Sequence, residues 1–128
     1  MFEEFREQFG CRTNYLFAQM AAQNGDASSM VSCLDRVVQT SILGLREVDA
    51  NKNWEKQAGM AFFKLAKALD EKGKVCREGA VLSLNYSLQY CDAGGMKPRL
   101  SGLSFQEIED YRENPTSIVS LKTLEIVE

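Results

Sequence analysis

The residue types that most often catalyse reactions or bind metals are scarce in this chain of 128 residues. It has no histidine, and its four cysteines, Cys11, Cys33, Cys76 and Cys91, form no Cys-x-x-Cys pair. Ser-His-Asp and Cys-His nucleophile systems and the usual histidine-containing zinc and di-iron sites are therefore excluded. The glycine-rich loops that bind nucleotide phosphates are also absent from the sequence. We predict no catalytic residue, metal site or cofactor, and we expect most of the cysteines to be reduced and buried.

Carboxylates are the remaining candidates for acid–base chemistry, and four of them cluster at Glu107, Glu109, Asp110 and Glu113. The segment 104–107, Ser-Phe-Gln-Glu, has the pattern of a capping box, in which Ser and Glu each satisfy a free backbone N–H at a helix start. The helix dipole also favours acidic side chains near this end. We therefore interpret the cluster as the beginning of a helix. A histidine-free enzyme that uses carboxylate or cysteine chemistry is kept as an alternative.

Basic residues are concentrated in the middle of the chain. Residues 51–99 contain nine Lys or Arg and five Asp or Glu, whereas the whole chain has a net charge of −3. A basic helix face can bind a phosphate backbone or an acidic protein, although it can equally be a solvated surface. The acidic overall charge argues against strong nonspecific nucleic-acid binding. If the protein binds a nucleic acid or another anion, the candidate residues are Lys56, Lys64, Lys67, Lys74 and Arg77.

Four phenylalanines are the candidates for contact with a protein partner. Phe2, Phe5 and Phe9 are spaced to share one face of a helix. Phe63 lies about 100° around its helix from the apolar stripe that contains Phe62, so its ring needs another surface to cover it. Such rings either pack onto the helices of the protein itself or form an aromatic ridge that fits a partner's groove.

These candidate residues lie on segments whose apolar spacing predicts helices. The first segment reads as one continuous helix, because a single stripe contains Phe2, Phe5, Phe9, Leu16 and Met20. That helix would include a glycine at position 10, at a cost of roughly 1 kcal/mol relative to alanine. Glycines and polar connectors separate the four main helices. We expect them over residues 2–23, from a cap at Asp26 or Ser28 to residue 48, over residues 54–72 and over residues 75–93.

The fourth segment permits two interpretations. Residues 82–90 alternate between apolar and polar side chains, which is typical of a half-buried strand. Val81, Leu84 and Leu88 also fit one face of a helix, and three preceding segments of similar length favour antiparallel helices with short loops. We therefore favour a helix. The alternative is an α+β fold in which residues 80–91 pair with residues 118–127 as antiparallel strands.

The expected fold is mainly α, an antiparallel helical bundle of about four main helices plus a short C-terminal helix over residues 105–113. We expect one helical domain over residues 1–128, with helical hairpins at 2–48 and 54–93 and a C-terminal extension at 96–128. Within residues 61–91, the small and apolar residues resemble the tetratricopeptide pattern, in which two helices cross closely. The turn is two residues longer than in that family, and no proline follows the second helix. Any two antiparallel amphipathic helices would give similar matches.

These observations favour a non-catalytic protein-interaction module that acts as an adaptor, an inhibitor or a small subunit of a larger assembly. The alternative is a helical nucleic-acid-associated subunit that uses the basic middle of the chain. No segment approaches the roughly 18 consecutive apolar residues of a membrane-spanning helix, so we expect no membrane partner. The acidic N-terminal segment is unlike a secretory signal, and we expect a cytoplasmic protein. Its expected partner is a protein, with a nucleic acid or a second copy of the chain as further options.

Overall fold

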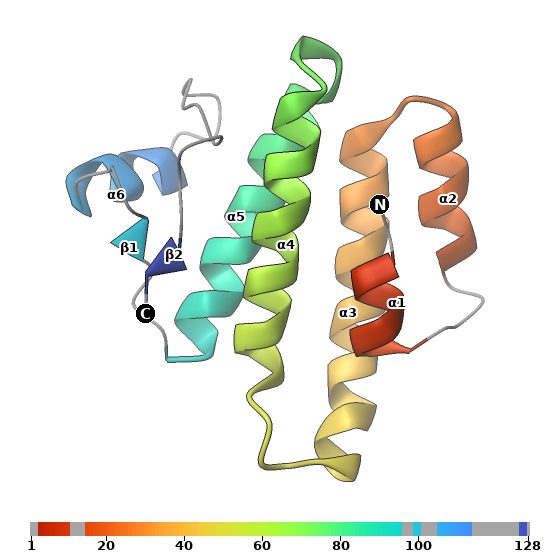
Figure 1. Ribbon diagram of the computed structural model, residues 1–128, viewed down its shortest axis with the longest axis vertical. Coiled ribbons are helices and arrows are strands. Elements are labelled where there is room, and N and C mark those ends of the chain that lie inside the picture. The colour runs from red at the N-terminus through yellow and green to blue at the C-terminus, as the bar shows by residue number, and fades with distance from the viewer. Residues whose placement is uncertain (1–2, 11–14, 96–98, 101–104, 114–125, 128) are drawn as a thin grey trace.

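The computed structural model describes residues 3–10, 15–95, 99–100, 105–113 and 126–127. Most of them are helical, and the helices pack against one another (Figure 1). The prediction of a mainly α helical bundle is confirmed. Its longest helices are α3 (Ala27–Val48), α4 (Trp54–Glu71) and α5 (Arg77–Ala93).

The predicted continuous helix over residues 2–23 is wrong, because the chain forms two helices there. α1 spans Glu3–Phe9 and α2 spans Tyr15–Gln23. Gly10 follows α1 with a φ of 89°, a left-handed conformation that glycine adopts readily and that commonly ends helices. The Tyr15 hydroxyl donates a hydrogen bond of 2.8 Å to the backbone carbonyl of Phe5, which ties α2 to α1 across the break.

α2 and α3 form an antiparallel pair (Figure 1). The turn between them contains Gly25, whose φ is 73°. Asp26 then caps α3, because its carboxylate accepts hydrogen bonds from the Ser29 backbone N–H at 3.1 Å and from the Ser29 hydroxyl at 2.6 Å.

α4 and α5 lie side by side along their lengths (Figure 1). The side-chain carbonyl of Asn53 caps α4 by accepting a hydrogen bond of 3.1 Å from the Lys56 backbone N–H. After α4, Gly73 adopts a φ of 83°, and the short 3₁₀ helix η1 (Lys74–Cys76) leads into α5. Residues 61–91 therefore form a helical hairpin with a 3₁₀ turn in its connection.

Small side chains allow α4 and α5 to approach closely. A methyl group at Gly59 would lie 2.4 Å from the sulfur of Cys91 and 2.9 Å from its backbone nitrogen. The buried hydroxyls of Ser83 and Ser87 donate hydrogen bonds of 2.7 and 2.6 Å to the backbone carbonyls of Phe62 and Gly59. Two of the polar positions in the alternating segment, Ser83 and Ser87, thus face the backbone of α4. The alternative that residues 80–91 form a strand is wrong, because they belong to α5.

The C-terminal part contains a short helix and a pair of two-residue strands. α6 spans Phe105–Glu113, as predicted. β1 (Arg99–Leu100) pairs antiparallel with β2 (Ile126–Val127), so the strand partner of residues 126–127 is β1 and not the segment 80–91. Residues 118–125 and the predicted capping residue Ser104 lie outside the described residues.

Aromatic rings join three helices in the core. The Phe62 ring of α4 lies edge-on to the Phe5 ring of α1, with 5.1 Å between their centroids. On the side of α5, the Tyr90 ring stacks on Phe62 at 5.6 Å and the Tyr86 ring is tilted against it at 5.5 Å. Phe9 extends the cluster towards the start of α4. Rings in these arrangements contribute stability beyond the apolar area that they bury.

Candidate functional site

Three of the four phenylalanines predicted to contact a partner lie in the core. Phe5 and Phe9 are each 1% exposed and Phe63 is 6% exposed. The first two are buried because α1 packs onto the bundle, where their rings contact aromatic rings of α4. At these three positions the rings pack onto the protein's own helices and do not form an exposed aromatic ridge. Phe2 lies outside the described residues.

α2 instead carries an exposed apolar face. The helix buries Tyr15 and Ala18 against the bundle, whereas Leu16 is 56%, Phe17 68% and Met20 50% exposed. Met20 lies four residues after Leu16 and three after Phe17, so its side chain neighbours both of theirs on the helix surface. Leu16, Phe17 and Met20 are called the α2 outer face below. Three large apolar side chains thus point away from the protein's own core.

This face was not predicted from the sequence, because one helix was expected to run through position 10. That helix would align Leu16 and Met20 with the core residues Phe5 and Phe9. The break after Gly10 instead gives α2 its own orientation, in which Tyr15 turns inwards. Gly10 was the residue in the sequence that could have indicated a break between the two helices.

The α2 outer face has no charged residue on its own helix. None of the nine residues of α2 is charged, although charged residues make up 26% of the whole chain. Apart from buried Tyr15, the polar side chains of α2 are the amides of Gln19 and Gln23, and exposed Asn24 follows the helix. Amides both donate and accept hydrogen bonds, so they can border an apolar contact without introducing a charge.

The candidate basic residues are divided between α4 and the start of the η1–α5 segment. Lys64 is exposed and pairs with Glu4 of α1 at 3.4 Å. The ammonium group of Lys67 lies 5.6 Å from the centroid of the Phe63 ring, within the range of a cation–π contact. Of the remaining candidates, Lys74 is exposed, and two are half-buried, Lys56 and Arg77.

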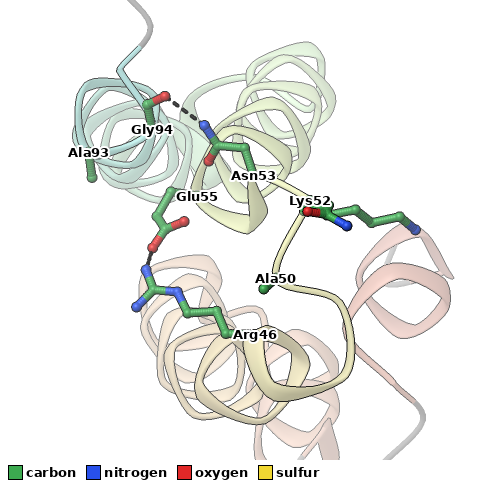
Figure 2. A pocket seen from close by; sticks show the side chains of 8 residues that line it. Arg46, Ala50, Lys52, Asn53, Glu55, Ala93 and Gly94 are labelled. Atoms are coloured by element: carbon green, nitrogen blue, oxygen red, sulfur yellow. Dashed lines mark hydrogen bonds and ion pairs between the residues drawn. The ribbon is translucent and has the colours of Figure 1, made fainter.

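A polar pocket of about 520 Å³ opens between the α3–α4 connection and the end of α5 (Figure 2). Arg46 and Glu55 form an ion pair with each other. The Asn53 amide donates a hydrogen bond of 2.7 Å to the backbone carbonyl of Gly94, so it links the start of α4 to the end of α5. Lys52 extends away from the other side chains in Figure 2. The pocket is therefore a junction of helix ends whose polar groups bind one another.

A buried carboxylate links α3 to α5. Asp35 is 6% exposed and accepts hydrogen bonds from the Tyr90 hydroxyl at 2.5 Å and from the Gln39 amide at 3.0 Å. Burial raises the pKa of Asp35, and the hydrogen bond from Tyr90 opposes that rise. Burial, together with the hydrogen bond to Asp35 and its charge, raises the pKa of Tyr90. Both donors are neutral side chains, and Phe62 stacks on the Tyr90 ring. We therefore interpret the hydrogen bond between Asp35 and Tyr90 as a contact that holds α3 against α5.

Within the residues that the structure describes, no group of three or more Cys, Asp or Glu could hold a metal ion. Among the described cysteines, Cys33 and Cys76 are half-buried and Cys91 is buried. Cys11 lies outside the described residues. In the same part of the chain, no helix is both long and apolar enough to cross a membrane.

The acidic cluster is carried by α6, whose first turn contains Glu107. On the same helix, the Gln106 amide donates a hydrogen bond of 3.0 Å to the Asp110 carboxylate. The candidate surfaces in the described part of the chain therefore include this acidic helix, the basic residues of α4, the polar pocket and the α2 outer face. Comparison with known proteins adds no further candidate, since no family model, curated protein or solved structure matches the chain.

Proposed function

We propose that this protein is a non-catalytic interaction module, an adaptor, inhibitor or small subunit of a larger assembly, that binds a protein through the α2 outer face. The supporting observation is that α2 turns Leu16, Phe17 and Met20 towards solvent. Contiguous exposed apolar patches mark protein–protein contact sites. Aromatic and methionine side chains are also enriched at such interfaces.

The size of the face indicates what it can contribute to binding. If a large apolar side chain presents about 200 Å² when fully exposed, the three residues together expose on the order of 350 Å². At about 25 cal/mol per Å², burying that area contributes on the order of 9 kcal/mol. Association costs roughly 4–15 kcal/mol, so the face supports modest affinity unless the partner buries apolar area of its own.

The shape of the face favours a helical contact. α2 has nine residues and is therefore about 13 Å long. The i, i+4 pair Leu16–Met20 and the i, i+3 pair Phe17–Met20 have the spacing of anchors that fit an apolar groove or the apolar side of another amphipathic helix. Such a contact uses the convex surface of one helix, so the α2 outer face can bind a partner without a cleft of its own.

Affinity capture from cells that make the protein tests this proposal. Phe17→Glu places a charge on the α2 outer face at its most exposed position. Leu43→Glu is the matched control, because Leu43 is 67% exposed, against 68% for Phe17, and lies on α3. The proposal predicts a stoichiometric protein that binds the wild type and Leu43→Glu but not Phe17→Glu. Equal capture by all three proteins would contradict it.

Nuclease treatment of the same samples separates the alternative function. Partners held by protein contacts stay bound after treatment, whereas partners bridged by a nucleic acid are lost. Loss of every partner from the wild type would favour the nucleic-acid-associated subunit and the basic residues of α4.

A further inference from the structure

We infer that the occupant of the α2 outer face is a second copy of this chain, an inference that rests on the function proposed for that face. Two copies of α2 would lie antiparallel about a two-fold axis. Leu16, Phe17 and Met20 of one copy would then contact the same three residues of the other. Interfaces of this kind use one surface twice and close on themselves as a dimer.

The absence of charge on α2 is the observation that selects a second copy. At a two-fold interface, a charged side chain near the axis faces its own copy, and like charges repel. α2 has no such side chain between Tyr15 and Gln23. Apart from buried Tyr15, its polar residues are Gln19 and Gln23, whose amides can donate to and accept from their own counterparts. A surface that recognises a different protein would not need to be free of both positive and negative charge.

The spacing of the apolar residues suits an antiparallel pair of helices. When the axis passes between positions 17 and 20, Phe17 of each copy lies opposite Met20 of the other. A thioether beside an aromatic ring is a favourable contact, and the flexible methionine can adapt to the ring. The phenylalanine and methionine would therefore form two equivalent contacts, one on each side of the axis.

The area of the face predicts a weak dimer. If each large side chain presents about 200 Å² when fully exposed, two copies bury on the order of 700 Å² of apolar surface from the three residues of each α2. Stable specific interfaces bury roughly 1,200–2,000 Å² in total. Association should therefore depend on concentration, with a dissociation constant in the micromolar range or weaker.

Sedimentation of the purified full chain over a wide concentration range tests this inference. The weight-average mass of the wild type should rise towards twice the monomer mass as the concentration reaches the high micromolar range. Phe17→Glu should weaken association at least tenfold, whereas Leu43→Glu should behave as the wild type. A wild type that stays monomeric, or a dimer that Phe17→Glu leaves intact, would overturn the inference. Circular dichroism confirms that each variant keeps its helices.

Mixing two variants tests the antiparallel geometry. Phe17→Glu and Met20→Lys should each be monomeric alone. In an equimolar mixture, Glu at position 17 of one copy meets Lys at position 20 of the other, while Met20 of the first keeps its contact with Phe17 of the second. Association should therefore return. A mixture that associates no better than either variant alone would contradict the two-fold arrangement.

The two sets of experiments distinguish this inference from the function on which it rests. A wild type that stays monomeric in sedimentation, but loses a captured protein through Phe17→Glu, would overturn the second copy and retain the interaction module. If Phe17→Glu changes neither self-association nor capture, both proposals fail.

Discussion

Asp35 shows how a single residue can contribute to helix packing at the expense of stability. Its carboxylate is buried on α3, and its hydrogen bonds come from the Tyr90 hydroxyl and the Gln39 amide, both of which are neutral. Burying an ionised group costs free energy, and neutral donors offset only part of that cost. Because burial raises the pKa of Asp35, the native state binds a proton more tightly there than the unfolded state does.

Asp35→Asn tests this cost. At pH 7 the variant should have a free energy of unfolding equal to that of the wild type or higher by up to about 2 kcal/mol, since it removes a buried charge. The stabilisation from protonating Asp35 is fully present below its unfolded-state pKa and is lost as pH rises through its raised folded-state pKa. The advantage of the variant should therefore shrink between pH 7 and pH 4, as measured by urea unfolding.

Tyr90→Phe is the companion variant, because it removes a donor to Asp35 and keeps the ring that stacks on Phe62. Its free energy of unfolding should fall by about 1–3 kcal/mol at pH 7. The loss should be smaller at pH 4, because a hydrogen bond to protonated, neutral Asp35 contributes less stability than one to its charged form. A loss of equal size at both pH values would contradict a charged Asp35 at neutral pH.

At the scale of the helices, apolar spacing predicted where helices form better than it predicted which side of each helix meets the core. The predicted helix over residues 105–113 coincides with α6, and the third predicted helix, 54–72, ends one residue after α4. Capping residues mark the starts of both in the sequence, and Gly73 or Pro115 follows their ends. The N-terminal helices could not be predicted in the same way. A glycine inside a helix costs only about 1 kcal/mol, so sequence alone did not require a break at Gly10.

The direction in which α2 faces was beyond prediction for a related reason. Spacing shows that Leu16 and Met20 share a side of the helix, but it does not show which side meets the core. That choice depends on tertiary contacts, including the hydrogen bond between the Tyr15 hydroxyl and the Phe5 carbonyl and the burial of Ala18. The burial of the predicted site residues Phe5 and Phe9 also depends on tertiary contacts, here with aromatic rings of α4.

Two helical glycines should respond to alanine in opposite ways. Gly59→Ala inserts a methyl group 2.9 Å from the Cys91 backbone nitrogen, so α4 and α5 must separate, and the free energy of unfolding should fall by about 1–3 kcal/mol. At Gly44 a methyl group would have nothing within 4 Å, and Gly44→Ala should raise the free energy of unfolding by about 0.5–1 kcal/mol. Urea unfolding of both variants measures the difference, and a stabilising Gly59→Ala would contradict the close packing of these helices.

At the scale of the whole molecule, aromatic residues near the N-terminus serve two purposes. Phe5 completes the core, whereas Phe17 lies outside it at 68% exposure. Phe5→Ala should lower the free energy of unfolding by about 3–5 kcal/mol, because it leaves a cavity beside Phe62. Phe17→Ala should change it by less than about 0.5 kcal/mol at concentrations where the protein is monomeric.

Thermal unfolding at low micromolar concentration compares these two variants directly. The expected ranking places the melting temperature of Phe5→Ala well below that of the wild type and that of Phe17→Ala close to it. Similar melting temperatures for the two variants would mean that α1 is not part of the stable core.

The central claim is that the α2 outer face joins two copies of the chain, and a dilution series of two-dimensional ¹H–¹⁵N NMR spectra tests it most directly. As the concentration falls from about 1 mM to about 10 μM, a weak dimer dissociates and the amides at its interface change chemical shift. The largest changes should map to residues 15–24, with little change around exposed Val48, which ends α3 on the side opposite the α2–α3 turn. Spectra that do not change with concentration, or changes centred away from α2, would contradict the claim.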